Sequence, residues 1–422
     1  MNNLLKAIDL HLLSTNTFIL KRNEIILVSL MALVNFTHIL DFMIMMPLGN
    51  ILMPKWHLTT SQFSVIVSSY SLAAFCSSFA AIFFADKFDR KKLLLFGYFG
   101  FLLGTLGCVF AFDANSMIIA RTITGIFGGL ISAQVLSIIG DIIPYERRGQ
   151  AMGLLMGGFA LASVIGVPFG LFLANHFDWY FPFLIVAFVG TLLYPFLLKF
   201  VPNVNAHLAN PVKLKERYQL FLKIFSNKTQ VTALAFSFLM IMGHFIIIPL
   251  FNPYIVYNVG VPQTSTPLIY LFGGISSLIT AQIAGKLADK YGKRQVFVVA
   301  GFVSLVFILM ITNLPKIPVY MVLIIFVFWF SATTSRTVPG QAMTTQAVTS
   351  QTRGSFMSLN SCVQSLGSGL AALVSGLITY SDKKFAIHNY NYLGYISVVL
   401  ILLCIVLAYK LDRLLITNST EI

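Results

Sequence analysis

The chain turns between two long apolar runs at Gly285-Lys286-Leu287-Ala288-Asp289-Lys290-Tyr291-Gly292-Lys293-Arg294. This is the second of two basic turns along the chain. The first, Asp86-Lys87-Phe88-Asp89-Arg90-Lys91-Lys92, lies 203 residues earlier and also separates two apolar runs. Only 10% of the residues are charged, so a repeated cluster of charges indicates a repeated architecture. Because Lys and Arg gather in the loops on one side of a membrane, the two clusters also predict a common side.

The composition is that of an integral membrane protein. Hydrophobic residues make up 57% of the chain and the mean hydropathy is +0.85, whereas soluble domains carry about 25% charged residues. Run after run reaches the roughly 20 apolar residues that a membrane helix needs. The runs are continuous and do not alternate with polar residues as outer-membrane strands do. We therefore predict an all-α membrane protein.

Polar and charged breaks divide the chain into twelve spans, near residues 25–48, 62–85, 93–112, 116–142, 150–174, 179–200, 231–257, 266–287, 295–312, 318–338, 354–380 and 392–411. A long polar connection divides them into two six-helix bundles. The predicted domains are a segment 1–24, a bundle 25–202, a linker 203–229, a bundle 230–411 and a tail 412–422. Apolar residues at helical spacing between lysines favour an amphipathic helix on the inner leaflet within the linker. A solvated linker is the alternative.

The positive charges orient these spans. In the twelve-span scheme, 22 of the 28 Lys and Arg residues face the side that holds the termini, and four face the other side. The positive-inside rule therefore predicts cytoplasmic termini and a multi-pass protein of the plasma membrane, such as a bacterial inner membrane. The net charge of +14 lies in short loops, so we expect no nucleic-acid partner. The four cysteines lie inside apolar runs, and no disulfide is predicted.

Further landmarks recur in the second half at nearly the same offset. Arg148-Gly149 recurs as Arg353-Gly354, and His38, nine residues before Pro47, recurs as His244, nine residues before Pro253. Six spans per repeat give the two halves the same orientation. Such repeats are related by an axis along the membrane normal, and their site lies between them near the middle of the membrane.

The second basic turn resembles the loop signature of the major facilitator superfamily, while the first has Ile82 and Asp89 in place of its two glycines. Arg121-x-x-x-Gly125-x-x-Gly128-Gly129 resembles the intramembrane arginine motif of that superfamily. Gly157 and Gly166-Val-Pro168-Phe-Gly170 are similar to the glycine–proline motif of its proton-coupled exporters, with Val167 inserted. The pattern over about residues 25–411 is most similar to the twelve-span drug:proton antiporters and arabinose-efflux-like permeases.

This resemblance implies a fold of two pseudo-symmetric six-helix bundles and a cytoplasmic gating motif. The motif residues are Asp86, Arg90, Asp141, Gly285, Asp289, Gly292 and Arg294. In the family, the equivalent loop acid and arginine bond to a neighbouring helix end and to an acid closing the fourth span. Here they would latch the outward-facing state, or the basic loops would only set topology. Gly157, Gly166, Pro168 and Gly170 would serve helix packing and bending.

Ionisable residues at membrane depth are costly and are candidates for function. Asp41 and Arg121 lie at compatible depths in the first and fourth spans, so we predict that they interact, with His38 one turn away. Protonation of Asp41 would release Arg121 and switch the protein between outward- and inward-facing states. A permanent structural ion pair is the alternative.

His244 is a candidate ligand for substrate or protons, and it could equally be a hydrogen-bonded interior group. Arg336 lies beside Pro339-Gly340, where it would either snorkel to the interface or attract anionic substrates. The remaining cavity candidates are polar or aromatic residues of the central spans: Asn35, Tyr70, Gln134, Asn252, Trp329, Asn360 and Gln364.

Taken together, these patterns predict a secondary transporter, monomeric in the bilayer, that exports a small organic molecule and is driven by inward proton flow. A proton-coupled importer of a metabolite or siderophore is the first alternative, and a non-transporting receptor or scaffold on the same fold is the second. The chain lacks a Gly-x-x-x-x-Gly-Lys-Ser/Thr loop and the His-Glu-x-x-His and Gly-x-Ser-x-Gly motifs. We therefore expect no enzyme activity, no catalytic or metal site and no cofactor, with the proton gradient as the energy source.

Overall fold

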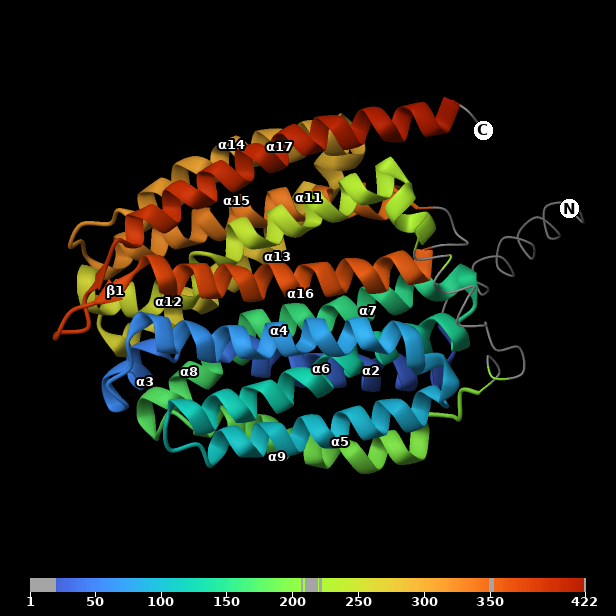
Figure 1. Cartoon of the computed structure of the whole chain (residues 1–422), viewed down its shortest axis with the longest axis horizontal. Coiled ribbons are helices and arrows are strands. Elements are labelled where there is room, and N and C mark those ends of the chain that lie inside the picture. The colour runs from blue at the N-terminus through green and yellow to red at the C-terminus, as the bar shows by residue number, and fades with distance from the viewer. Residues whose placement is uncertain (1–19, 206–207, 209–218, 220–221, 349–352, 421–422) are drawn as a thin grey trace, which may run out of the picture.

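The computed structural model describes residues 20–205, 208, 219, 222–348 and 353–420. Within these residues, twelve helices are long and apolar enough to cross a membrane, as the sequence predicts. The six spans of the first half occupy the lower part of the view in Figure 1, and the six of the second half occupy the upper part. The linker prediction for residues 203–229 falls largely outside the described residues.

The first half contains α2 (Arg22–Ile44), α3 (Gly49–Lys55), α4 (Thr60–Phe84), α5 (Arg90–Val109), α6 (Ala114–Ile142), α7 (Arg148–Leu161), the π-helix η3 (Ala162–Gly166), α8 (Val167–His176) and α9 (Phe181–Phe200). The second half contains α11 (Lys228–Phe245), α12 (Ile248–Tyr254), the π-helix η5 (Ile255–Val259), α13 (Thr266–Tyr291), α14 (Lys293–Thr312), α15 (Val319–Gln346), α16 (Arg353–Ile378) and α17 (Tyr390–Thr420). A short antiparallel hairpin, β1 (Tyr380–Ser381) and β2 (Ile387–His388), precedes α17.

Because consecutive spans alternate in direction, both basic turns lie at one end of the molecule, together with the start of α2 and the end of α17 (Figure 1). We call this the basic end and the other the opposite end. Several spans begin with a side-chain cap. The Asp113 carboxylate accepts from the backbone N–H of Ser116 at 2.8 Å and starts α6. Hydrogen bonds from the Ser116 side chain and backbone lower the pKa of Asp113.

The first and seventh spans are each broken, whereas the sequence predicts them as continuous over 25–48 and 231–257. Helix α2 ends at Ile44 and α3 begins at Gly49, while α11 ends at Phe245 and α12 begins at Ile248. Pro47 and Pro249 at these breaks have no N–H to donate. A carbonyl freed at the second break, that of Ile247, accepts a hydrogen bond from the Tyr390 hydroxyl at 2.9 Å.

The fifth span contains a π-helix. Residues 162–166 form η3 directly before Pro168, which lacks an N–H and lies in the first turn of α8. The regular α-helix is therefore interrupted in the turn that precedes the proline, as is common where membrane helices bend.

The tenth and twelfth spans are longer than the sequence predicts. Helix α15 continues through Pro339 to Gln346, eight residues past the predicted end at 338. Helix α17 continues to Thr420, through the segment predicted as a tail. The prediction that the tenth span ends before Pro339-Gly340 is therefore wrong. Membrane helices continue through a proline where neighbouring helices bond the backbone carbonyl that the proline leaves without a donor.

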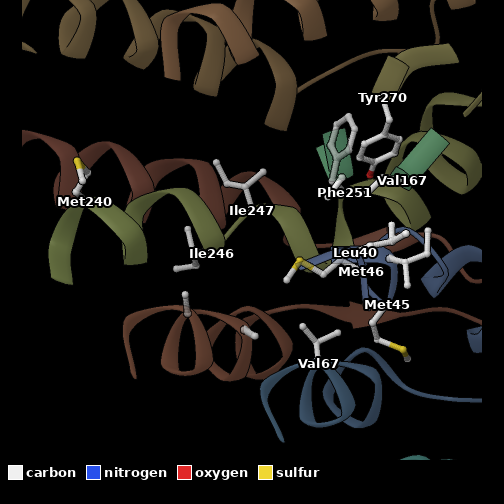
Figure 2. Packing of buried hydrophobic residues seen from close by; sticks show 14 of the residues in the cluster. Leu40, Met45, Met46, Val67, Val167, Met240, Ile246, Ile247, Phe251 and Tyr270 are labelled. Carbon is white, nitrogen blue, oxygen red and sulfur yellow. The ribbon is translucent and has the colours of Figure 1, made fainter. Parts of the chain in front are cut away.

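The two halves meet along α4 and α16, which lie beside each other in Figure 1. Helix α13 packs against η3 and α8, the part of the fifth span nearer the opposite end. Most buried apolar side chains of both halves belong to one hydrophobic cluster, and a small separate cluster lies around Ala81 and Leu93. Figure 2 shows part of the large cluster around the broken spans, where Leu40, Met45 and Met46 belong to the first half and Ile247 and Phe251 to the second.

Candidate functional site

A fully buried ion pair lies inside the first half. The Nη1 atom of Arg121 on α6 is 2.6 Å from Oδ2 of Asp41 on α2, and the two side chains are 1% and 0% exposed. Nη1 also donates to the backbone carbonyl of Asp41 at 3.1 Å. The Thr105 hydroxyl of α5 donates to Oδ1 of Asp41 at 3.2 Å. The predicted contact between Asp41 and Arg121 is confirmed, and Thr105 is a partner that its ordinary position in the third span did not reveal.

Aromatic and imidazole groups cover this pair on the side of α4. The guanidinium carbon of Arg121 lies 4.5 Å from the centre of the Tyr70 ring, a cation–π distance. The His38 ring lies 6.1 Å from that of Tyr70. A Cβ atom at Gly128 would lie 2.6 Å from the Tyr70 hydroxyl and 2.9 Å from His38 Nε2, so the glycine leaves room for both groups. Among the described residues, the Tyr70 hydroxyl and His38 Nδ1 are buried without a hydrogen-bond partner.

A series of ring contacts connects this cluster to the second half. The rings of Tyr70 and Phe42 are 5.2 Å apart, and Phe42 lies 5.8 Å from Phe245 across the interface of the halves. The ring centres of Phe245 and His244 are 5.6 Å apart, and those of His244 and Trp329 are 5.7 Å apart. The structure therefore brings His244 and Trp329 together and links them, through aromatic rings, to the Asp41–Arg121 pair.

Arg336 is buried in the second half. It lies ten residues before the end of α15 and is 1% exposed, which places it about 15 Å from the helix end. The predicted snorkelling of Arg336 to the interface is therefore wrong. Its Nη1 donates to the Ser304 hydroxyl at 3.4 Å, and its Nε has no partner among the described residues. No described acidic residue forms an ion pair with this guanidinium.

Other cavity candidates are buried polar groups with spare hydrogen-bonding capacity. Gln134 and Asn360 are 1% and 2% exposed, and each has an unpaired side-chain carbonyl oxygen among the described residues. The buried indole N–H of Trp329 also has no hydrogen-bond partner among the described residues. Asn35 and Gln364 are half-buried on α2 and α16. Such groups are available to a bound molecule.

Asn252, another cavity candidate, links the two halves, and its side-chain carbonyl oxygen has no hydrogen-bond partner among the described residues. Its amide nitrogen donates to the Pro47 carbonyl at 2.5 Å and to Oδ1 of Asn50 at 2.8 Å, so it ties α12 to the start of α3. The Tyr257 hydroxyl donates to the Asn50 carbonyl at 2.6 Å. Two further links at the opposite end join Thr60 to Thr379 and Asn175 to Gln263. All hydrogen bonds between two described residues of different halves lie toward this end.

At the basic end, the first copy of the motif forms a compact cluster. Arg90 lies 3.1 Å from Asp86 at the end of α4 and 2.5 Å from Asp141 near the end of α6. The three residues therefore join as the family resemblance implies. Arg147 pairs with Glu24 at 2.8 Å, with 11% and 14% of the side chains exposed. This second contact ties the loop after α6 to the first turn of α2, and the sequence analysis missed it.

The two copies of the motif build different turns. Gly292 adopts φ +93°, a conformation that favours glycine, and precedes α14. Asp89 stands at the matching position with φ −58°, and its side chain caps α5 by accepting from the Lys91 and Lys92 N–H groups. In the second copy Arg294 pairs with Asp412 of α17 at 2.9 Å. Asp289 is exposed, without a described ion-pair partner, and a Cβ at Gly285 would meet nothing within 4 Å.

The glycines of the fifth span divide into two groups. A Cβ at Gly166 would lie 2.9 Å from Leu40, and one at Gly170 would lie 2.7 Å from Ile44, so both allow α2 to approach closely. Gly157 does not pack in this way, contrary to the prediction, since a Cβ there meets nothing within 4 Å. The close approach to α2 is made by its neighbour Gly158, against Ala32, while Gly157 is on the open side of α7.

Two six-span halves of the same orientation, packed along α4 and α16, with broken spans and a buried ion pair between their ends, are the features of a membrane transporter built from repeats. The sequence profile of the Major Facilitator Superfamily matches residues 31–328 and 233–420, and the chain belongs to this family. It is a secondary transporter and not an enzyme, which removes the receptor or scaffold alternative.

The relatives and solved structures are distant. The chain is 23% identical over 82% of its length to an uncharacterized MFS-type transporter, YceJ, of Bacillus subtilis, covering 87% of that protein. It is 21% identical over 57% of its length to a probable sugar efflux transporter of Helicobacter pylori, covering 60% of it. A crystal structure of a D-xylose-proton symporter shares its fold, with a TM-score of 0.72, 16% identity, and coverage of 90% of this chain and 96% of that one.

Proposed function

We propose that this transporter exports a small organic compound and is driven by inward proton flow, with the Asp41–Arg121 pair as the coupling element. The observation that carries this proposal is the burial of that pair, 0% and 1% exposed. A buried ion pair is costly to desolvate and is weak evidence for a purely stabilising role. Its position inside the bundle makes its charge state a natural switch.

The coupling step follows from charge. With Asp41 ionised, the pair is neutral overall, and Arg121 is held by Asp41 and by the Tyr70 ring. Protonation of Asp41 leaves Arg121 with an uncompensated charge in a low-dielectric interior, so Arg121 must move or find another partner. The ring contacts from Tyr70 to His244 transmit this change to the second half. Substrate binds between the halves, near His244 and Trp329.

Alternating access is proposed from the distribution of contacts between the halves. The hydrogen bonds of Asn252 hold the opposite end closed. Helix α7 begins at the basic end, and one of its faces carries Gly149, Gly153 and Gly157. A Cβ atom built on any of these three glycines would have no other atom within 4 Å. We assign this conformation as inward-facing, with the basic end in the cytoplasm of the plasma membrane. The contacts of Arg90 with Asp86 and Asp141 are already made in this conformation, so the cluster supplies only the first half's side of the latch, which closes against the second half in the outward-facing state.

The main alternative function differs from the proposed one in the direction of transport. The sugar efflux relative favours export, and the fold is shared with a D-xylose-proton symporter, so a proton-coupled importer is the second candidate. Everted and right-side-out vesicles from cells that overproduce the protein would separate the two, using a panel of labelled drugs, sugars and siderophores. Export predicts accumulation in everted vesicles with an acid interior. Import predicts accumulation in right-side-out vesicles with an acid exterior and would overturn the proposal.

A further inference from the structure

A groove of about 380 Å³ lies between α13, α14 and α15, away from the Asp41–Arg121 pair. Its walls are mainly apolar and include Leu287, Tyr291, Val296, Val299, Val303 and Ala332. The side chains of Leu287, Tyr291, Val299 and Val303 are 40–63% exposed, so the groove opens on the outside of the helix bundle. In a membrane, this outside surface faces lipid.

The groove begins at the second basic turn. Residues 296–303 are the first turns of α14, which starts at Lys293. At 1.5 Å per residue, Val303 lies about 15 Å below the start of that helix. The groove therefore extends inward from the membrane surface at the basic end, along the path that the acyl chain of a lipid in that leaflet would take.

Three lysines lie on the turn at which the groove begins. Lys286 and Lys290 belong to the last two turns of α13, and Lys293 is the first residue of α14. The Lys290 Nζ atom lies 5.1 Å from the centre of the Tyr291 ring, and Tyr291 itself lines the groove. Asp289 is the acidic residue on the same turn, while the charge of Arg294 is matched by Asp412.

We propose that this groove binds one anionic phospholipid, whose acyl chain lies along Val299 and Val303 and whose phosphate contacts Lys286, Lys290 and Lys293. Apolar walls select a hydrocarbon chain, and three lysines at the surface select a negative headgroup. The first basic turn has lysines at the same end, at Lys87, Lys91 and Lys92. Those three provide a charge-matched control for the experiment.

The test is native mass spectrometry of the full chain in detergent with added phosphatidylglycerol or phosphatidylcholine. The unaltered protein is expected to retain one phosphatidylglycerol in preference to phosphatidylcholine. Replacement of Lys286, Lys290 and Lys293 by Gln should weaken phosphatidylglycerol binding at least about tenfold. The same replacement at Lys87, Lys91 and Lys92 should leave it nearly unchanged. Equal losses in the two variants would mean that only bulk charge attracts the lipid, and would overturn the proposal.

The apolar part of the site has its own pair of variants. Val303→Trp places an indole in the groove and should displace the bound lipid, whereas Val306→Trp alters an exposed residue of α14 that does not line it. Retention of phosphatidylglycerol by Val303→Trp would exclude the groove as the acyl-chain site. Equal binding of phosphatidylcholine to the unaltered protein would reject headgroup recognition. Both readouts are independent of transport.

Discussion

Arg121 and Arg336 are both buried arginines at membrane depth, and of the two only Arg121 has an acidic partner among the described residues. Arg121 lies 2.6 Å from Asp41, whereas the hydrogen bond described for the Arg336 side chain is the 3.4 Å contact with Ser304. The two residues are equally inaccessible, at 0% and 1% exposure. The same substitution at the two positions should therefore have opposite effects.

Arg121→Met should destabilise the protein by about 3–5 kcal/mol, because it leaves the Asp41 carboxylate buried without its partner. Arg336→Met should be neutral or stabilising by up to about 4 kcal/mol, since it replaces an unpaired buried charge by an apolar chain of similar length. Thermal unfolding of the purified variants in one detergent measures both. A large loss of stability in Arg336→Met would show that this cation has a compensating partner that the present contacts do not include.

Asp41→Asn removes the proposed proton acceptor and should abolish proton-driven transport. The expected accumulation in vesicles with an imposed pH gradient is that of vesicles without the protein, while substrate binding at equilibrium persists. Asp178→Asn is the control, because it breaks the exposed pair with Lys55, and such pairs contribute about 0–1 kcal/mol. Undiminished gradient-driven transport by Asp41→Asn would leave the ion pair with a structural role alone.

Asn252→Ala should favour opening at the opposite end, because it removes the hydrogen bonds to Pro47 and Asn50. Spin labels on cysteines introduced by Phe112→Cys and Tyr320→Cys, in a chain whose four native cysteines are replaced, would report a longer separation. Asn313→Ala provides the comparison, since Asn313 bonds only within its own half among the described residues. An unchanged distance distribution in Asn252→Ala would remove these bonds from the closure mechanism.

Gly157→Leu should fold normally and stop transport. A side chain at Gly157 enters open space in this conformation, and it would obstruct α7 from closing against α13 in the outward-facing state. Gly158→Ala is the contrasting variant, because its methyl group would collide with the Ala32 carbonyl of α2 and lower the unfolding temperature. Substrate binding by thermal shift, measured beside vesicle transport, separates a trapped protein from a misfolded one. Normal turnover by Gly157→Leu would contradict the assignment of α7 as a moving contact.

The sequence predicts the spans well because each depends on local properties. A run of about 20 apolar residues forms a helix in a bilayer whatever its neighbours are, since its backbone groups must bond within the segment. The breaks at Pro47 and Pro249 and the continuation of α15 through Pro339 were not predicted. A proline breaks a membrane helix or leaves it intact according to which neighbouring groups satisfy the freed carbonyls, such as the Tyr390 hydroxyl at the Ile247 carbonyl.

Some contacts of the candidate site could be predicted from the sequence, and others could not. The contact between Asp41 and Arg121 could be anticipated because charges are rare in the spans and these two opposite charges lie at compatible depths. Thr105 could not, because a threonine in an apolar run carries no signal of its neighbour. Asn252 was assigned to the cavity by its position along the span, and its hydrogen bonds to Asn50 and Pro47 of the other half could not be inferred from that position.

The class of protein, the twelve spans, the repeat and the rare charges within the spans can be read from the sequence alone, because hydropathy and charge are properties of single residues and short segments. The packing of the helices was needed to show that Arg336 is buried without an acidic partner among the described residues, that Asn252 joins the halves and that Gly157 meets open space. These facts depend on which faces of different helices meet. In a bilayer, nearly every face is apolar, so the hydrophobic pattern carries little information about how the helices are rotated.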